Sequence, residues 1–129
     1  MDLAMKVEML SNEVEKILGE CVHIANAANE ETLNEVSKEA LKIAKDHAPK
    51  QSGDYEKTLK RKKTKDQNGE AEYTIYASGT GGSLSHLLEN GHASRNGGFV
   101  SGKPHFKPAM DHANSKLEED FKKKLNEKL

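Results

Sequence analysis

The spacing of apolar residues changes near Pro49, and this change decides the fold class. Before Pro49, apolar residues recur at steps of three and four, which is the period of one face of an α-helix. Beyond the turn that follows Pro49 the period falls to about two, most clearly in residues 72–78, as in a strand with one buried face. The sequence therefore predicts helix followed by a small sheet, the pattern of an α+β domain.

The helical stripe before Pro49 has two stretches, separated by the polar run from Asn29 to Thr32. The first stretch extends from Leu3 to about Ala28. Asn29 and Thr32 are residue types that start helices, so a long helix with a bend near residue 29 and a continuous helix both stay open. The second stretch carries Leu33, Val36, Ala40, Ile43 and Ala44.

This helix is expected to end at about His47. Lys45 and His47 place cations near the exposed carbonyls of a helix C-terminus, which is favourable. Pro49 disfavours the helical conformation at the preceding residue. The segment from Pro49 to Asp54, which includes Gly53, has the composition of a turn.

Two antiparallel strands follow the turn. The range 58–65 has few apolar residues, whereas Glu72 to Ser78 alternates in polarity. Asp66 to Gly69 joins the two ranges, and its Asn-Gly pair is the strongest short signal of a β-hairpin. We expect a hairpin with its turn at these residues.

Two glycine-rich segments come next, and both are expected to be flexible loops, at about 79–83 and 92–103. The first contains Gly79, Gly81 and Gly82 and leads into a short predicted helix from Leu84 to Glu89. Asn90-Gly91 has the composition that closes such a helix. The second segment is expected to hold at most a short strand, and its notable residues are Gly97, Gly98, Gly102, Phe99 and Val100.

The last helix is expected to begin near Phe106, with Pro108 tolerated in its first turn. Its apolar residues Ala109, Ala113, Leu117, Phe121 and Leu125 recur every four positions. We expect one α+β domain spanning residues 1–129, with the long N-terminal helix and the C-terminal helix packed on one face of a small antiparallel sheet. Structural corners are expected at Pro49, Gly53, Glu89, Gly91, Pro104, Phe106 and Pro108.

Composition limits the classes of protein that the chain can represent. Hydrophobic residues make up 34% and Trp is absent, so the core is expected to be thin and aliphatic. The formal net charge of −1 gives no reason to expect a nucleic-acid binder from the whole chain. No apolar run approaches the ~18–20 residues of a membrane span, and the first residues lack the order of a secretory signal. The single Cys21 is expected to be a small buried apolar residue in a reducing cytosol.

One constellation suggests metal chemistry. His86, Glu89 and His92 are residue types that bind zinc and other divalent metals. However, His92 follows Gly91 and lies outside the predicted helix, so we expect ordinary polar roles, no metal and no cofactor. The glycines at 79–83 resemble a phosphate-binding loop but lack its Gly-Lys-Ser/Thr ending, and a connector is the favoured interpretation.

The range 57–65 is strongly basic and contains no acidic residue. One interpretation is an edge strand that lysines keep soluble and unpaired, and we favour it. The alternative is a surface that contacts nucleic-acid phosphates or an acidic partner. The basic residues are Lys57, Lys60, Arg61, Lys62, Lys63 and Lys65.

The order of these segments resembles a known family. Residues 40–54, with Ala48-Pro49 and Ser52-Gly53, resemble the helix end and "A-P-x-x-[ST]-G-x-L" turn of the HK97 gp10-like family of tailed-phage head-tail joining and tail completion proteins. Residues 73–76 are similar to its central strand and residues 86–93 to its "Y-A-x-x-[VL]-E-[FY]-G" motif. Residues 102–109 are similar to the "P-x-[PH]-F-[LMI]-[RK]-P-A" motif that opens its last helix. Tyr55, His86 and Asn90 depart from these patterns.

The resemblance implies a structural subunit without a catalytic centre. Its copies would form a ring, often a hexamer, at the junction of capsid and tail or at the head-proximal end of the tail tube. The subunit would be made in the bacterial host cytoplasm and would contact other connector and tail tube proteins. The two glycine-rich segments, with Phe99 and Val100, would then contact adjacent copies. The basic strand would line the channel that conducts DNA.

Overall fold

The computed structural model describes residues 3–50, 53–67 and 70–129. The chain begins with a 45-residue helix, α1 (Leu3–His47), followed by a short helix, α2 (Asp54–Thr58). The strands β1 (Leu59–Gln67) and β2 (Glu70–Ala77) come next, and then helix α3 (Thr80–Asn90). Two short strands, β3 (Gly91–Ala93) and β4 (Phe99–Ser101), precede the last helix, α4 (Phe106–Lys128).

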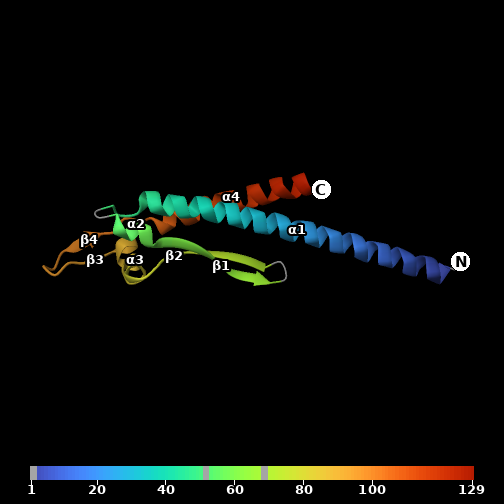
Figure 1. The fold of residues 1–129 in the computed structure, drawn as a ribbon, viewed down its shortest axis with the longest axis horizontal. Coiled ribbons are helices and arrows are strands. Elements are labelled where there is room, and N and C mark those ends of the chain that lie inside the picture. Colours follow the sequence, from blue (N-terminus) through green and yellow to red (C-terminus); the bar gives the residue numbers. More distant parts are fainter. Residues whose placement is uncertain (1–2, 51–52, 68–69) are drawn as a thin grey trace.

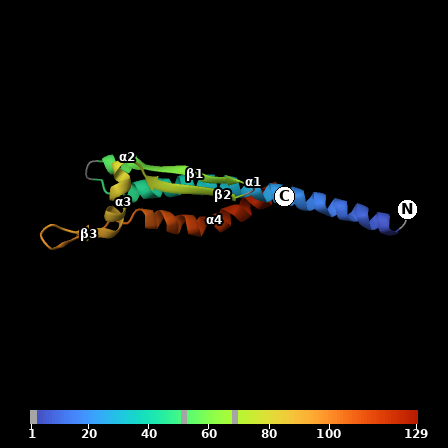
Figure 2. The same cartoon turned by 90° about the horizontal axis from the view of Figure 1, so that it is seen from below.

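The molecule is elongated and has two layers over half of its length (Figure 1). Helix α4 lies beside the C-terminal half of α1, and the β1–β2 hairpin runs along the same half of α1 (Figure 2). Helix α3 and the β3–β4 hairpin form the end of the molecule that is remote from the N-terminus. The expected α+β architecture, with both long helices on one side of a small antiparallel sheet, is confirmed.

The β1–β2 hairpin has the expected antiparallel pairing, from Leu59 opposite Ala77 to Gln67 opposite Glu70. The register shifts between Lys63 and Lys65, where one strand carries an extra residue. The Asn-Gly pair predicted to make the turn lies outside the described residues.

The buried apolar core is aliphatic, as the composition predicts, and most of its residues are alanines. Alanines on one face of α1 are buried against Leu59 of β1 and Ala109 of α4, and the absence of longer side chains lets the elements approach closely. Phe106, Ile75 and Tyr55 pack around this cluster but stay partly exposed. Among the α1 residues whose burial is described, the buried apolar ones are Ala28, Val36, Ala40 and Ala44, and Ala48, which is also buried, follows the end of the helix.

Helix α1 passes through residue 29 without a break, so the continuous alternative is the right one. Thr32 does not cap a second helix. It is buried, and its hydroxyl donates to the carbonyl of Ala28 at 2.8 Å, one turn earlier in the same helix. The helix ends at His47, as predicted, and His47 Nδ1 lies 2.9 Å from the carbonyl of Ile43.

Two loop predictions were wrong. Residues 80–83 form the first turn of α3 and not a flexible connector. Gly81 is buried against the side chain of Thr58, so closely that a Cβ at this position would overlap it. Close packing therefore overrides the weak helix propensity of glycine. The segment after Gly91 was expected to hold at most one short strand, but it forms two paired strands, with His92 opposite Val100.

Cys21 was predicted to be buried, and this was also wrong: its side chain is exposed. Helix α4 ends at Lys128, whose Nζ lies 2.9 Å from Glu31. It is therefore too short to reach Cys21, and every side chain from Ser11 to His23 is exposed.

Candidate assembly surfaces and the junction of α3 with α4

Glu89 of α3 caps the N-terminus of α4. One carboxylate oxygen, Oε1, accepts the backbone N–H groups of His105 at 2.8 Å and Phe106 at 2.9 Å. The other, Oε2, accepts the N–H of Lys107 at 3.1 Å. The first N–H groups of a helix have no partner within the helix, and a carboxylate beside them also suits the helix dipole. Glu89 thus acts as the N-cap side chain of α4, although it lies far from α4 in the sequence.

The charge on Glu89 is stabilised in this position. Burial by itself would raise the pKa of the carboxyl group. The backbone N–H groups of His105, Phe106 and Lys107 outweigh burial, and the imidazole of His105 adds to them, so the pKa lies below its ordinary value. Glu89 is therefore ionised at neutral pH, as a helix cap requires.

His105 connects this cap to α2, the short helix that leads into β1. Its side chain is fully buried, and its Nδ1 lies 2.9 Å from the carbonyl of Lys103 and 3.0 Å from Glu89 Oε1. Both of these atoms are acceptors, so Nδ1 carries a proton, and in the neutral imidazole Nε2 then accepts the hydroxyl of Tyr55 at 2.7 Å. Burial, together with the charge of Glu89, raises the pKa of Tyr55 to about 12.

Gly91 gives the chain its sharp turn at this junction. Its φ of 86° and ψ of 174° lie in a region that residues with a Cβ seldom occupy. A Cβ there would also meet the carbonyl of Val100 and the ring of Phe99. The predicted corner residues Glu89 and Gly91 thus contact the segment before α4, where Lys103 N–H donates to the Leu88 carbonyl at 2.7 Å.

The other predicted corners lie on both sides of this region. Pro104 precedes His105, whose ring centroid is 4.5 Å from that of Phe106, and Pro108 lies in the first turn of α4. Pro49 follows the C-terminus of α1. Gly53 precedes α2 with a φ of 75°.

The candidate metal residues do not converge. His86 is exposed, and both carboxylate oxygens of Glu89 accept hydrogen bonds from the start of α4. Nδ1 of His92 is buried without a hydrogen-bond partner. Among the described residues, no group of three His, Cys, Asp or Glu side chains is placed to hold a metal ion.

The basic strand is divided between two faces. Arg61 points towards α1, donates to Asn34 at 3.0 Å and Ser37 at 3.1 Å, and lies over the ring of Tyr73. This guanidinium is thus held by the core side of the hairpin and is not available to a phosphate.

Lys63 also belongs to that face, where it pairs with Glu30 and with Asp66. Lys62 lies on the other face, above the ring of Tyr76. The basic residues of the strand region that remain exposed are Lys57, Lys60, Lys62 and Lys65.

The β3–β4 hairpin lies at one end of the molecule (Figure 1), and two of its apolar side chains are exposed. Phe99 is 67% exposed and Val100 is 45% exposed. Hydrogen bonds order the turn of this hairpin. Ser94 N–H donates to the Gly98 carbonyl at 2.8 Å, Gly98 N–H donates to the Ser94 hydroxyl, and Gly97 N–H donates to the Ser94 carbonyl. Gly97 and Gly98 are exposed, in contrast to the buried Gly81 of α3, which has no surface to offer to another copy.

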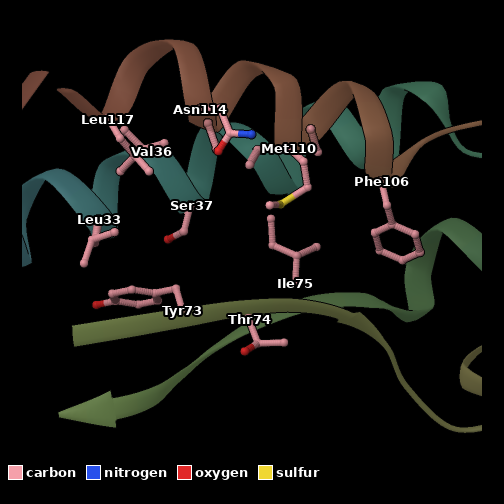
Figure 3. A pocket seen from close by; sticks show the side chains of 13 residues that line it. Leu33, Val36, Ser37, Tyr73, Thr74, Ile75, Phe106, Met110, Asn114 and Leu117 are labelled. Carbon is pink, nitrogen blue, oxygen red and sulfur yellow. The ribbon is translucent and has the colours of Figure 1, made fainter. Parts of the chain in front are cut away.

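An apolar groove of about 410 Å³ lies between α1, α4 and β2 (Figure 3). Met110, 56% exposed, and Phe106 approach it from α4, while Tyr73 and Ile75 form the opposite side on β2. Leu33 of α1 lies at one end beside Tyr73. The groove is thus a second apolar surface, separate from the β3–β4 hairpin.

Comparison with family models, with curated proteins and with solved structures gives no match. In the described part of the chain, no helix is both long and apolar enough to span a membrane.

Sequence reasoning missed the role of His105 and Tyr55 and the capping function of Glu89. The only local signal was a histidine placed between Pro104 and Phe106, at the start of an amphipathic helix. The partners lie 16 and 50 residues away, and no periodicity indicates such distant pairs.

Proposed function

We propose that this chain is a non-enzymatic structural subunit of a tailed-phage or prophage virion. Its copies assemble into a ring, often a hexamer in the family that the chain resembles, at the head-tail junction or at the head-proximal end of the tail. The family resemblance supplies the place and the class of assembly. Two stretches that carry this resemblance, residues 86–93 and 102–109, are held together by Glu89, which supports treating them as one structural unit.

The observation that carries the proposal is the presence of two different exposed apolar surfaces on one small domain. The β3–β4 hairpin presents Phe99 and Val100, and the groove presents the residues around Met110. A contact between two different surfaces is heterologous, and repeated heterologous contacts close into a ring when the rotation allows. We propose that the hairpin of one copy docks into the groove of the next.

In this assembly the neighbours are connector and tail tube proteins, and the channel conducts DNA. The exposed lysines in and beside β1 are Lys57, Lys60, Lys62 and Lys65. They are suited to non-specific contact with phosphates, which carry no sequence information. The subunit would be made in the host cytoplasm and would end in the virion.

The proposal is tested by introducing charged residues into the β3–β4 hairpin. Phe99→Asp with Val100→Asp should abolish rings seen by negative-stain electron microscopy and reduce the mass measured by sedimentation. The matched control is Asn96→Asp, at an exposed position in the turn of the same hairpin. Rings that survive the double substitution, with the same mass as those of the control, contradict the proposed contact.

A second candidate function is a small nucleic-acid-binding protein. The observation in its favour is that Lys57, Lys60, Lys62 and Lys65 stay exposed near one another in sequence. It predicts duplex binding that weakens steeply with salt in a filter-binding titration and is lost in Lys60→Ala with Lys62→Ala. Tight binding of that kind by the free subunit would favour this function over the structural one.

A further inference from the structure

The N-terminal half of α1 projects alone from the molecule (Figures 1 and 2). Helix α4 and the β1–β2 hairpin cover only the C-terminal half, and every side chain from Ser11 to His23 is exposed. A helix of this length without packing is marginally stable in water, since most helical stability in proteins comes from burial of an apolar face. The projecting half therefore needs a partner.

The apolar residues of this half follow a seven-residue repeat. Val14 and Cys21 occupy the first position of the heptad, called a, and Ile17 and Ile24 occupy the fourth, called d. Val14 is 46% exposed and Ile17 is 55% exposed. In the sequence the repeat comprises Leu3, Val7, Leu10, Val14, Ile17, Cys21, Ile24 and Ala28.

An unbroken 3.5-residue repeat over more than three heptads is typical of a helix that pairs with another helix. Leu18 and Ala25, at the e positions, widen the apolar face beside this repeat. The chemistry of the missing partner is thus that of an α-helix with the same repeat.

This seam is continuous with the buried face of α1. Ala28, the last a position, is fully buried, and the buried face then continues through Thr32, Val36 and Ala40. The seam is therefore the extension of a face that already packs in the interior, and it becomes free where α4 ends.

We propose that residues 3–28 of α1 form a parallel, two-stranded coiled coil with a second copy of this chain. Valine at position a with leucine at position d favours two strands, whereas isoleucine at d favours three or four. The first part of the repeat has the two-stranded pattern, with Val7 and Val14 at a and Leu3 and Leu10 at d, and isoleucine occupies d at Ile17 and Ile24.

The charges beside the seam select the parallel orientation. Glu13 and Glu20 occupy the g positions that flank it. In a parallel pair they face the e positions of the second copy, which are Leu18 and Ala25, so no like charges meet. In an antiparallel pair g positions face g positions, and Glu13 would lie opposite Glu20, which is unfavourable.

This inference is independent of the proposed ring. The coiled coil uses the N-terminal end of the molecule, whereas the proposed ring contact uses the β3–β4 hairpin and the groove. Either interface can therefore fail without the other.

Cys21 provides a direct test, because a parallel pair in register brings the two Cys21 thiols together across the seam. Oxidation of the full chain with diamide should give a disulfide-linked dimer on a non-reducing gel. The control carries Cys21→Ala and Lys16→Cys, which moves the thiol to the outer face of the same helix. Cross-linking should be roughly tenfold faster or more at position 21, since facing thiols have a high effective concentration.

A second variant measures the association itself. Sedimentation should give twice the 14.2 kDa of one chain for each coiled-coil pair, and Ile17→Asp should lose that pairing. The matched control is Asn12→Asp, on the face opposite the seam. Since residues 11–23 are exposed, both variants should keep the thermal unfolding transition of the rest of the domain.

The outcomes separate the two proposals. Equal cross-linking rates at positions 16 and 21, or the same mass for wild type and Ile17→Asp, overturn the coiled coil. Rings without accelerated Cys21 cross-linking support the hairpin contact alone. Dimers with accelerated Cys21 cross-linking but without rings support the coiled coil alone.

Discussion

The carboxylate of Glu89 accepts the backbone N–H of His105 at 2.8 Å, although His105 lies 16 residues further along the chain, directly before α4. Through this contact α3 sets the position and direction of α4. The connection between the two helices includes the exposed β3–β4 hairpin, so the junction also anchors the base of that hairpin. The stability of this junction is therefore open to several direct measurements.

Removal of the Glu89 carboxylate should destabilise the domain. We expect Glu89→Ala to lower the free energy of unfolding by about 2–3 kcal/mol, since backbone N–H groups at the start of α4 lose a charged acceptor. Glu89→Gln keeps one acceptor oxygen and should cost about 1 kcal/mol. Urea denaturation followed by circular dichroism measures both values.

The control for this series is Glu119→Gln, whose side chain is 72% exposed on α4. Substitutions at such surface positions change stability by less than about 0.5 kcal/mol. If Glu89→Ala behaved like this control, the capping role of Glu89 would be rejected.

The contribution of Glu89 should depend on pH in a defined direction. Its pKa is lowered in the folded protein, so the charged cap stabilises the fold above the ordinary carboxyl value of 4.5, and this stability is lost as the pH falls through the folded pKa. The difference in unfolding free energy between wild type and Glu89→Gln should thus be full at pH 7 and shrink below about pH 4.5. A difference that stays constant down to pH 3 would contradict this account.

Tyr55 should ionise at unusually high pH. An absorbance titration should show a tyrosine with a pKa of about 12, which is missing in Tyr55→Phe. Because the folded pKa is raised, this group stabilises the fold below its ordinary value of 10.0, and that stability is lost as the pH rises towards 12. At neutral pH, Tyr55→Phe should cost about 1–3 kcal/mol, since the buried Nε2 of His105 loses its donor.

Gly91 should tolerate no side chain. Gly91→Ala places a Cβ at a φ of 86° and against the Val100 carbonyl, and we expect a loss of about 1–3 kcal/mol or more in unfolding free energy. Gly98→Ala, in the same hairpin but without a positive φ, is the control. Equal melting temperatures of the two variants would show that the Gly91 conformation is not required.

Local signals predicted several elements correctly. Pro49 and the cations before it placed the end of α1, the alternation of residues 72–78 placed β2, and Phe106 marked the start of α4. Each of these signals depends on residues within one or two turns of the element. They follow from backbone conformation and from the period of the apolar residues.

Non-local contacts explain what the sequence did not predict. The first turn of α3 depends on Gly81 fitting against Thr58, and the cap of α4 depends on Glu89 in another helix. The exposure of Cys21 depends on the length of α4, since the apolar spacing of α1 is the same whether or not a partner covers it. In each case a tertiary relationship decided between two locally acceptable structures.

The central claim is that this chain works by assembling with further copies of itself. Sedimentation velocity of the full chain over a wide range of concentrations, with negative-stain imaging of the same samples, tests it most directly. The account predicts concentration-dependent association that ends in closed rings. A chain that sediments as a 14.2 kDa monomer at every concentration and forms no rings would contradict it.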